Sequence, residues 1–141
     1  MINRMKMFGF ALLAWPLGLM LGGCSKQGED QAKARFQEYM TAWQERNFHR
    51  AWELMSPSLK SQNYSESQFT NFAKAQNVGP AGFTIQKIDV KGTVAIIAVD
   101  IAFRELTSNK MLGADRQACE LSLHNGLWYF DSCKLPNSRR E

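Results

Sequence analysis

The stretch TVAIIAVDIAF, from Thr93 to Phe103, decides the fold. From Ala95 onward one side of it is apolar, with Ala95, Ile97, Val99, Ile101 and Phe103. The other side carries Val94, Ile96, Ala98, Asp100 and Ala102, and Asp100 is its one charged residue. A period of two predicts a β-strand. Because both sides are mostly apolar, we expect a central strand with helices on one face. The other face should be covered by a partner, another segment or the curl of the sheet.

Further strand-forming segments surround this central strand. Thr84–Val90 carries β-branched residues, and a Lys91-Gly92 turn joins it to the central strand. After a polar loop at Glu105–Lys110, two more segments, Arg116–Leu123 and Leu127–Lys134, have strand character. The sequence therefore predicts an antiparallel sheet of about four strands.

Amphipathic helices precede the sheet. Apolar residues spaced three and four positions apart predict helices over residues 32–47, 48–55 and 65–78. Ser65 and Gln68 have the spacing of a capping box at the start of the third helix. Pro57 ends the second helix, because the residue before a proline disfavours the helical region, and Gly79–Gly82 is predicted to be a loop. Helices first and an antiparallel sheet afterwards make an α+β fold.

Cys119 and Cys133 lie on the last two predicted strands, and we expect them to form a disulfide in an oxidising compartment. A two-residue Asn125-Gly126 turn would place Cys119 opposite Ser132 and forbid the bond. A loop centred on Gly126 would place the two cysteines opposite each other, within the Cα spacing that a disulfide tolerates. We therefore predict a three- or five-residue loop, or a bulge. The alternative is a redox-active pair, which usually has the Cys-x-x-Cys spacing that is missing here.

The N-terminal segment has the parts of a bacterial export signal. Arg4 and Lys6 provide the positive start, and Phe8–Leu21 forms the apolar region. This region is shorter than the roughly 20 apolar residues that span a bilayer, and Pro16 interrupts it. Leu21-Gly22-Gly23-Cys24 closes the region and resembles the lipobox of bacterial lipoproteins.

The resemblance to lipoproteins implies cleavage before Cys24 and lipidation of that cysteine. Two or three acyl chains would anchor the protein stably, since each buried CH₂ contributes about 0.8 kcal/mol. Ser25 resembles the sorting pattern of the outer membrane, so we expect the domain to face the periplasm. The alternative is an ordinary secretory signal that leaves an odd thiol. The lipoprotein interpretation divides the chain into a signal peptide (1–23), a lipidated cysteine with a short flexible tether (24–31), a domain (32–135) and a polar tail (136–141).

Composition excludes several classes of function. Once Arg4 and Lys6 leave with the signal, 15 of the 17 basic residues remain against 13 acidic ones, a balance that does not suit a nucleic-acid-binding surface. No His or Cys pair has the spacing of a metal site, and the Gly79–Gly82 segment lacks the Lys-Ser/Thr of a phosphate-binding loop. We therefore expect one domain with no cofactor, no metal and no nucleic-acid partner.

Three segments carry a resemblance to a protein family: Trp43, Asn47-Phe48-x-x-Ala51-Trp52-Glu53-Leu54-Met55-Ser56-Pro57, and Gly126-Leu127-Trp128-Tyr129. They resemble the small NTF2-like, cystatin-like domains of exported bacterial lipoproteins, over residues 32–135. The resemblance implies a cone in which a strongly curved antiparallel sheet wraps the helices and can leave an apolar pocket. The residues expected to line such a pocket are Trp43, Trp52, Phe72, Asp100 and Phe103. A packed aromatic core is the alternative for most of them.

This fold hosts enzymes, carriers and interaction modules, so a catalytic role depends on individual residues. Enzymes of the superfold often use an Asp or His that reaches into the cone, and Asp89, Asp100, His49 and His124 are the candidates. Asp100 is the best of them, because a carboxyl group between apolar neighbours can have a raised pKa. The alternative places Asp100 on the outer face of the sheet.

Absence of a catalytic constellation favours a non-catalytic binding or assembly module. We expect it to be anchored in the membrane through Cys24 and to contact another envelope protein or a copy of itself. The first alternative is a carrier or sensor of a small apolar molecule held in the cone. The second alternative is an enzyme that uses Asp100.

Overall fold

The structure, a computed structural model, describes residues 23–62 and 65–135, with side chains from Lys26 onward. Residues 1–22 of the predicted leader, the side chain of Cys24 and the polar tail lie outside this described part. No helix in the described residues is long and apolar enough to cross a membrane.

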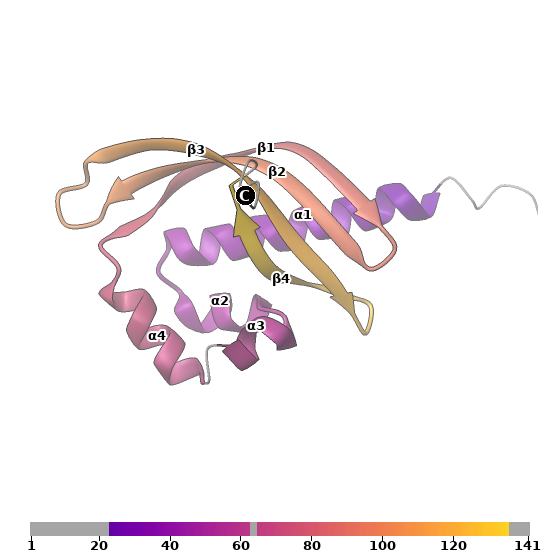
Figure 1. The fold of residues 1–141 in the computed structure, drawn as a ribbon, viewed down its shortest axis with the longest axis horizontal. Coiled ribbons are helices and arrows are strands. Elements are labelled where there is room, and N and C mark those ends of the chain that lie inside the picture. The colour runs from indigo at the N-terminus through magenta and orange to yellow at the C-terminus, as the bar shows by residue number, and fades with distance from the viewer. Residues whose placement is uncertain (1–22, 63–64, 136–141) are drawn as a thin grey trace, which may run out of the picture.

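Four antiparallel strands form one sheet in the order β1-β2-β3-β4. Their bounds are β1 Val78–Lys91, β2 Val94–Glu105, β3 Met111–His124 and β4 Leu127–Lys134. Figure 1 shows that the sheet is curved and open. The sequence prediction of a central strand at 93–103 is confirmed, because β2 pairs with β1 on one side and β3 on the other.

Helices cover the concave side of this sheet. Their bounds are α1 Gly23–Gln44, α2 Phe48–Leu54, α3 Pro57–Gln62 and α4 Glu66–Ala75. The long α1 lies directly against the sheet, and the three short helices form a further layer beyond it (Figure 1). The segment after α2 is tied to the edge strand, since Met55 bridges Phe130 and the Ser56 backbone N–H donates to the Phe130 carbonyl at 2.8 Å. The predicted α+β fold is confirmed.

The core lies between α1 and the inner face of the sheet. Alternate residues of β2, namely Ala95, Ile97, Val99 and Ile101, are at most 3% exposed. Phe36 of α1, Leu54 of α2 and Leu121 of β3 are buried against them. The period of two in the sequence therefore identified the buried side of the central strand correctly.

The first helix begins earlier than the sequence pattern predicted. α1 begins at Gly23 rather than at Ala32, so residues 25–31 are helical and do not form a flexible tether. A contact with the sheet explains this difference, because a Cβ on Gly28 would lie 3.8 Å from Val90 Cγ1. Packing against β1 thus extends a helix whose polar sequence gave no signal of burial.

Two further differences between the sequence prediction and the structure lie at prolines. Gly79–Gly82 is the beginning of β1 and not a loop, and the strand register shifts between Pro80 and Gly82. A proline is tolerated there because β1 is an edge strand with a bulge at this point. Pro57 does end α2, as predicted, but it also begins α3, whose first turn is capped by the Ser56 hydroxyl accepting from the Leu59 N–H at 3.1 Å.

The β3–β4 hairpin combines two features that the sequence analysis treated as alternatives. The turn has two residues, since His124 pairs with Leu127, and Asn125 and Gly126 both have positive φ. A register shift between Glu120 and Leu121 then restores the opposition of Cys119 and Cys133. The predicted disulfide is present with an S–S distance of 1.94 Å, and the bulge is the alternative that is confirmed.

Candidate functional site

The tryptophans predicted to line a cone pocket pack against other aromatic rings. Trp43 lies edge-on to Phe48 at 5.4 Å and to Phe69 at 5.8 Å between ring centroids. Trp52 lies 5.7 Å from the same Phe69. Phe48 and Phe69 are buried, so these rings fill the space between α1, α2 and α4. For both tryptophans, a packed core is the observed arrangement.

The remaining predicted pocket residues lie apart from this cluster. Phe103 is half-buried and packs against the core from the end of β2. Phe72 of α4 is 62% exposed, and its side chain lies on the surface. The five residues therefore do not meet in one pocket, and the prediction of that lining was wrong.

Asp100 lies on the outer face of β2, opposite to the buried residues. Its Oδ1 accepts from Arg116 Nε at 2.7 Å, and its Oδ2 accepts from Arg116 Nη2 at 2.9 Å and from Gln86 Nε2 at 3.0 Å. Hydrogen bonding and charge from Arg116 lower the pKa of the Asp100 carboxyl below its usual value. The expected raised pKa was therefore wrong, and a carboxylate held in a bidentate pair on the outer face does not reach into a cone.

The other catalytic candidates also form surface pairs. His49 Nδ1 lies 2.5 Å from Glu66 Oε1, and the Glu66 carboxylate raises the pKa of this exposed histidine. His124 Nε2 lies 2.9 Å from the Ser122 hydroxyl, and Asp89 lies 3.8 Å from the Lys91 ammonium. Within residues 23–62 and 65–135, no group of three or more His, Cys, Asp and Glu side chains is placed to hold a metal ion.

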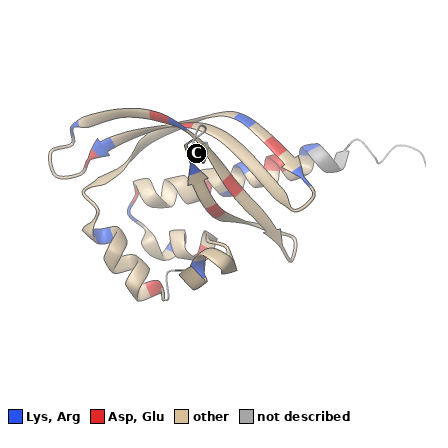
Figure 2. Ribbon diagram, in the orientation of Figure 1, with Lys and Arg blue, Asp and Glu red and all other residues tan. Residues whose placement is uncertain are grey.

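A chain of polar contacts that sequence analysis missed links α1 to α2 and to β4. Arg35 of α1 donates to the Trp128 carbonyl at 2.9 Å and pairs with Glu38 at 3.2 Å. Glu38 also accepts from Arg50 of α2, which in turn pairs with Glu53 at 2.8 Å. Figure 2 shows charges of both signs spread over the helices and strands of the described residues.

A groove lies between the first half of α1 and the β3–β4 hairpin. It has two lobes of about 500 and 330 Å³, which share Gln31, Gly126 and Trp128. Val90 and Leu123 form apolar walls of the larger lobe. We call this feature the α1–hairpin groove.

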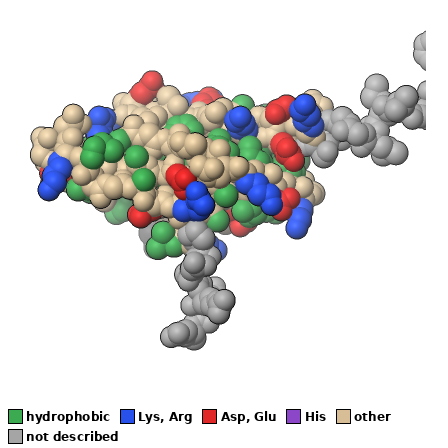
Figure 3. Space-filling view, turned by 90° about the horizontal axis from the view of Figure 1, so that it is seen from above, with side chains coloured by type: hydrophobic (Ala, Val, Ile, Leu, Met, Phe, Trp, Pro, Cys, Tyr) green, Lys and Arg blue, Asp and Glu red, His purple; other side chains and the backbone are tan. Residues whose placement is uncertain are grey.

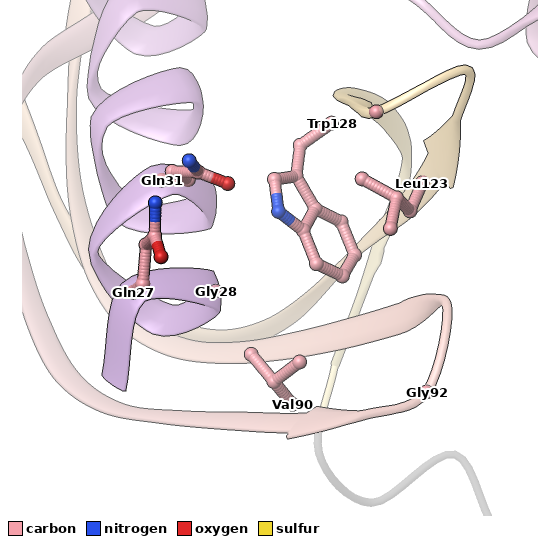
Figure 4. A pocket seen from close by; sticks show the side chains of 8 residues that line it. Gln27, Gly28, Gln31, Val90, Gly92, Leu123 and Trp128 are labelled. Carbon is pink, nitrogen blue, oxygen red and sulfur yellow. The ribbon is translucent and has the colours of Figure 1, made fainter. Parts of the chain in front are cut away.

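Three polar side chains face this groove. Figure 4 shows the carboxamide of Gln31 on α1 pointing toward the indole of Trp128 on β4, while the side chain of Gln27 extends along the same helix toward Gln31. The nitrogen edge of the indole is directed at this side of α1. Trp128 is 4% exposed. Among the described residues, neither its indole N–H nor the two carboxamides has a hydrogen-bond partner. The groove therefore presents unpaired donors and acceptors beside apolar walls.

Sequence analysis did not find this groove. The sequence pattern predicts a flexible tether at Gln27 and Gln31, and it indicates Trp128 only as part of the family resemblance. One signal was present, because residues four apart share a face if the segment is helical. The helix itself could not be predicted from residues 25–31, since its stabilising contact is with distant β1.

A second surface feature lies at the opposite end of α1. Val78, Met111 and Leu112 are 47%, 56% and 52% exposed at the sheet end where β1 and β3 begin. They lie near the α1 C-terminus, because Gln44 Nε2 donates to the Ala81 carbonyl of β1 at 3.1 Å. Hydrophobic side chains gather at the left end of the view in Figure 3, which is this end of the sheet. We call Val78, Met111 and Leu112 the apolar end.

Comparison with known proteins concerns the fold. No family model matches the chain, and no curated protein matches it in sequence. It is similar to the solved structure of a SEC-C motif containing protein from Rhodopseudomonas palustris, with 13% identity, a TM-score of 0.53 and coverage of 73% of each chain. It is also similar to a protein of unknown function with a cystatin-like fold from Nostoc punctiforme, with 8% identity, a TM-score of 0.48 and coverage of 75% of this chain and 92% of that chain. At such identity, the first likeness shows a shared α+β fold and nothing about activity.

Proposed function

We propose that this protein is a lipid-anchored envelope protein whose domain is a non-catalytic binding or assembly module. The observation that carries the proposal is the apolar end, where three large apolar side chains are about half exposed at the beginnings of β1 and β3, which flank the end of β2. Clustered exposed apolar surface is typical of protein contact sites. The partner is another envelope protein or a second copy of this chain.

The position of the apolar end suits a protein that is held to a membrane at its other end. Position 24 lies in the first turn of α1, and the 22-residue helix spans about 33 Å at 1.5 Å per residue. The apolar end lies near the far end of that helix. Anchored through Cys24 in the outer membrane, the domain would direct this surface away from the lipid and into the periplasm.

In-cell photocrosslinking tests the proposal. A photoreactive phenylalanine analogue at Leu112 should give a discrete crosslinked product, and its mass would distinguish a second copy from another envelope protein. The matched control is the same analogue at Ile96, which is 39% exposed on the outer face of the sheet. The proposal fails if Leu112 and Met111 give no product, or if Ile96 gives the same product in equal yield.

A further inference from the structure

The α1–hairpin groove has the chemistry of a binding site that is separate from the apolar end. We propose that it binds an extended, uncharged peptide segment. In this arrangement the carboxamides of Gln27 and Gln31 and the indole N–H of Trp128 bond to the peptide backbone, and an apolar side chain of the peptide lies against Val90 and Leu123.

Spacing of the two glutamines matches an extended chain. Gln27 and Gln31 are one turn apart on α1, which separates them by about 6 Å along the helix at 1.5 Å per residue. Alternate residues of an extended peptide repeat every 6.6 Å or so, since a strand rises about 3.3 Å per residue. Each carboxamide offers both a donor and an acceptor, as does each peptide unit. The two glutamines can therefore bond to alternate residues of one bound strand.

Electrostatics of the groove favour an uncharged ligand. The larger lobe is lined by carboxamides, apolar side chains and glycines, without an ionised group. The smaller lobe adds Arg35 and Glu38, which pair with each other at 3.2 Å. A charged side chain brought into the larger lobe would lose hydration without gaining a partner of opposite charge.

Unpaired polar groups also argue against other occupants. An acyl chain would cover the Trp128 N–H and the carboxamides without giving them a hydrogen bond, and this is costly. A sugar would use the open face of an aromatic ring, but Trp128 is 4% exposed and directs the nitrogen edge of its indole to the groove. A peptide backbone supplies the acceptor that this edge lacks.

The rim of the groove allows a backbone to approach. Gly126 borders both lobes, and a Cβ there would meet no atom within 4 Å. Its φ of 78° is required by the two-residue turn. The hairpin tip therefore adds little bulk where the peptide would enter.

Nuclear magnetic resonance of the ¹⁵N-labelled full chain in detergent tests the proposal. The probe is the neutral peptide acetyl-Ala-Leu-Ala-amide, and the reporter is the indole N–H signal of Trp128, assigned from a Trp128→Phe spectrum. We expect a saturable shift of this signal and at least tenfold weaker binding for acetyl-Ala-Glu-Ala-amide, because the larger lobe has no cation to pair with Glu.

Matched variants locate the site. Gln31→Ala should weaken binding of the neutral probe at least tenfold, whereas Gln37→Ala, an exposed glutamine of the same helix outside the groove, should leave it unchanged. Both positions are exposed, so neither variant threatens the fold. Absence of a saturable shift at Trp128, equal binding by Gln31→Ala, or tighter binding of N,N′-diacetylchitobiose than of the peptide would each overturn the proposal. The outcome is independent of the apolar end, which crosslinking tests separately.

Discussion

At the scale of single residues, ion pairing decides the role of the titratable side chains. The sequence around Asp100 and around His49 does not decide which groups these two side chains contact. In the fold, Asp100 meets Arg116 across the β2–β3 pair, and His49 of α2 meets Glu66 of α4. Each partner favours the charged form of the group it contacts, so both side chains are held in ion pairs on the surface.

The His49–Glu66 pair predicts a pH-dependent contribution to stability. His49 has a raised pKa because of the Glu66 carboxylate, with a further contribution from Glu53. A raised pKa in the folded state stabilises the fold below the unfolded pKa of 6.5, and the stabilisation is lost as pH rises through the folded value. His49→Gln should therefore lower the melting temperature at pH 5.5 but not at pH 8.5, by a few degrees at most, because both partners are solvent-exposed.

Thermal denaturation at the two pH values provides the measurement. His124→Gln is the control, since His124 contacts the Ser122 hydroxyl rather than a carboxylate. An equal loss at both pH values in His49→Gln would show that the pair contributes through packing alone.

At the scale of elements, the start of a helix is determined by local sequence signals in one case and by contacts with distant residues in another. The third predicted helix begins where its capping residue indicates, because the Ser65 hydroxyl accepts from the Gln68 N–H at 3.2 Å. The start of α1 was not predictable in this way. Its first turns depend on packing against β1, where Gly28 lies beside Val90.

The cap of α4 should be measurable on its own. Ser65→Ala should lower the free energy of unfolding by about 1 kcal/mol, because a helix N–H then loses its partner. Ser67→Ala, an exposed position inside the same helix, should change it by less than about 0.5 kcal/mol. Urea denaturation of the two variants compares them directly, and equal effects would contradict a capping role.

At the scale of the whole molecule, the two candidate contact surfaces lie at opposite ends of α1. The α1–hairpin groove is next to the position of Cys24, and the apolar end is beyond the helix C-terminus. A lipid-anchored domain arranged in this way would have the groove close to the membrane. Its apolar end would face the periplasmic space.

The proposed lipid anchor gives a prediction for the whole molecule. Cys24→Ala should leave the precursor uncleaved and mislocalised, because the lipoprotein peptidase requires the lipidated cysteine. Ser25→Asp is the matched variant, which should remain processed but shift toward the inner membrane. Membrane fractionation with intact-mass measurement reads out both variants. A processed Cys24→Ala protein in the outer membrane would contradict the lipoprotein interpretation.

Sequence alone determined the α+β class, the central strand, the buried side of that strand and the disulfide. These features follow from local periodicity and from residue types whose chemistry is the same wherever they lie, as with Ala95, Ile97 and Cys119. The sequence did not decide the register of the β3–β4 hairpin, because a bulge and a longer loop would both bring the two cysteines together.

Only the tertiary structure decided which side chains meet. The length of α1, the ion pair of Asp100 and the α1–hairpin groove each depend on contacts between residues far apart in the chain, such as Gly28 with Val90 and Arg35 with Trp128. Such contacts leave no periodic pattern in the sequence. For this reason the aromatic residues predicted to line a pocket proved to be core and surface residues. One wall of the groove is instead formed by Gln27 and Gln31, which lie in helical turns that the sequence pattern did not indicate.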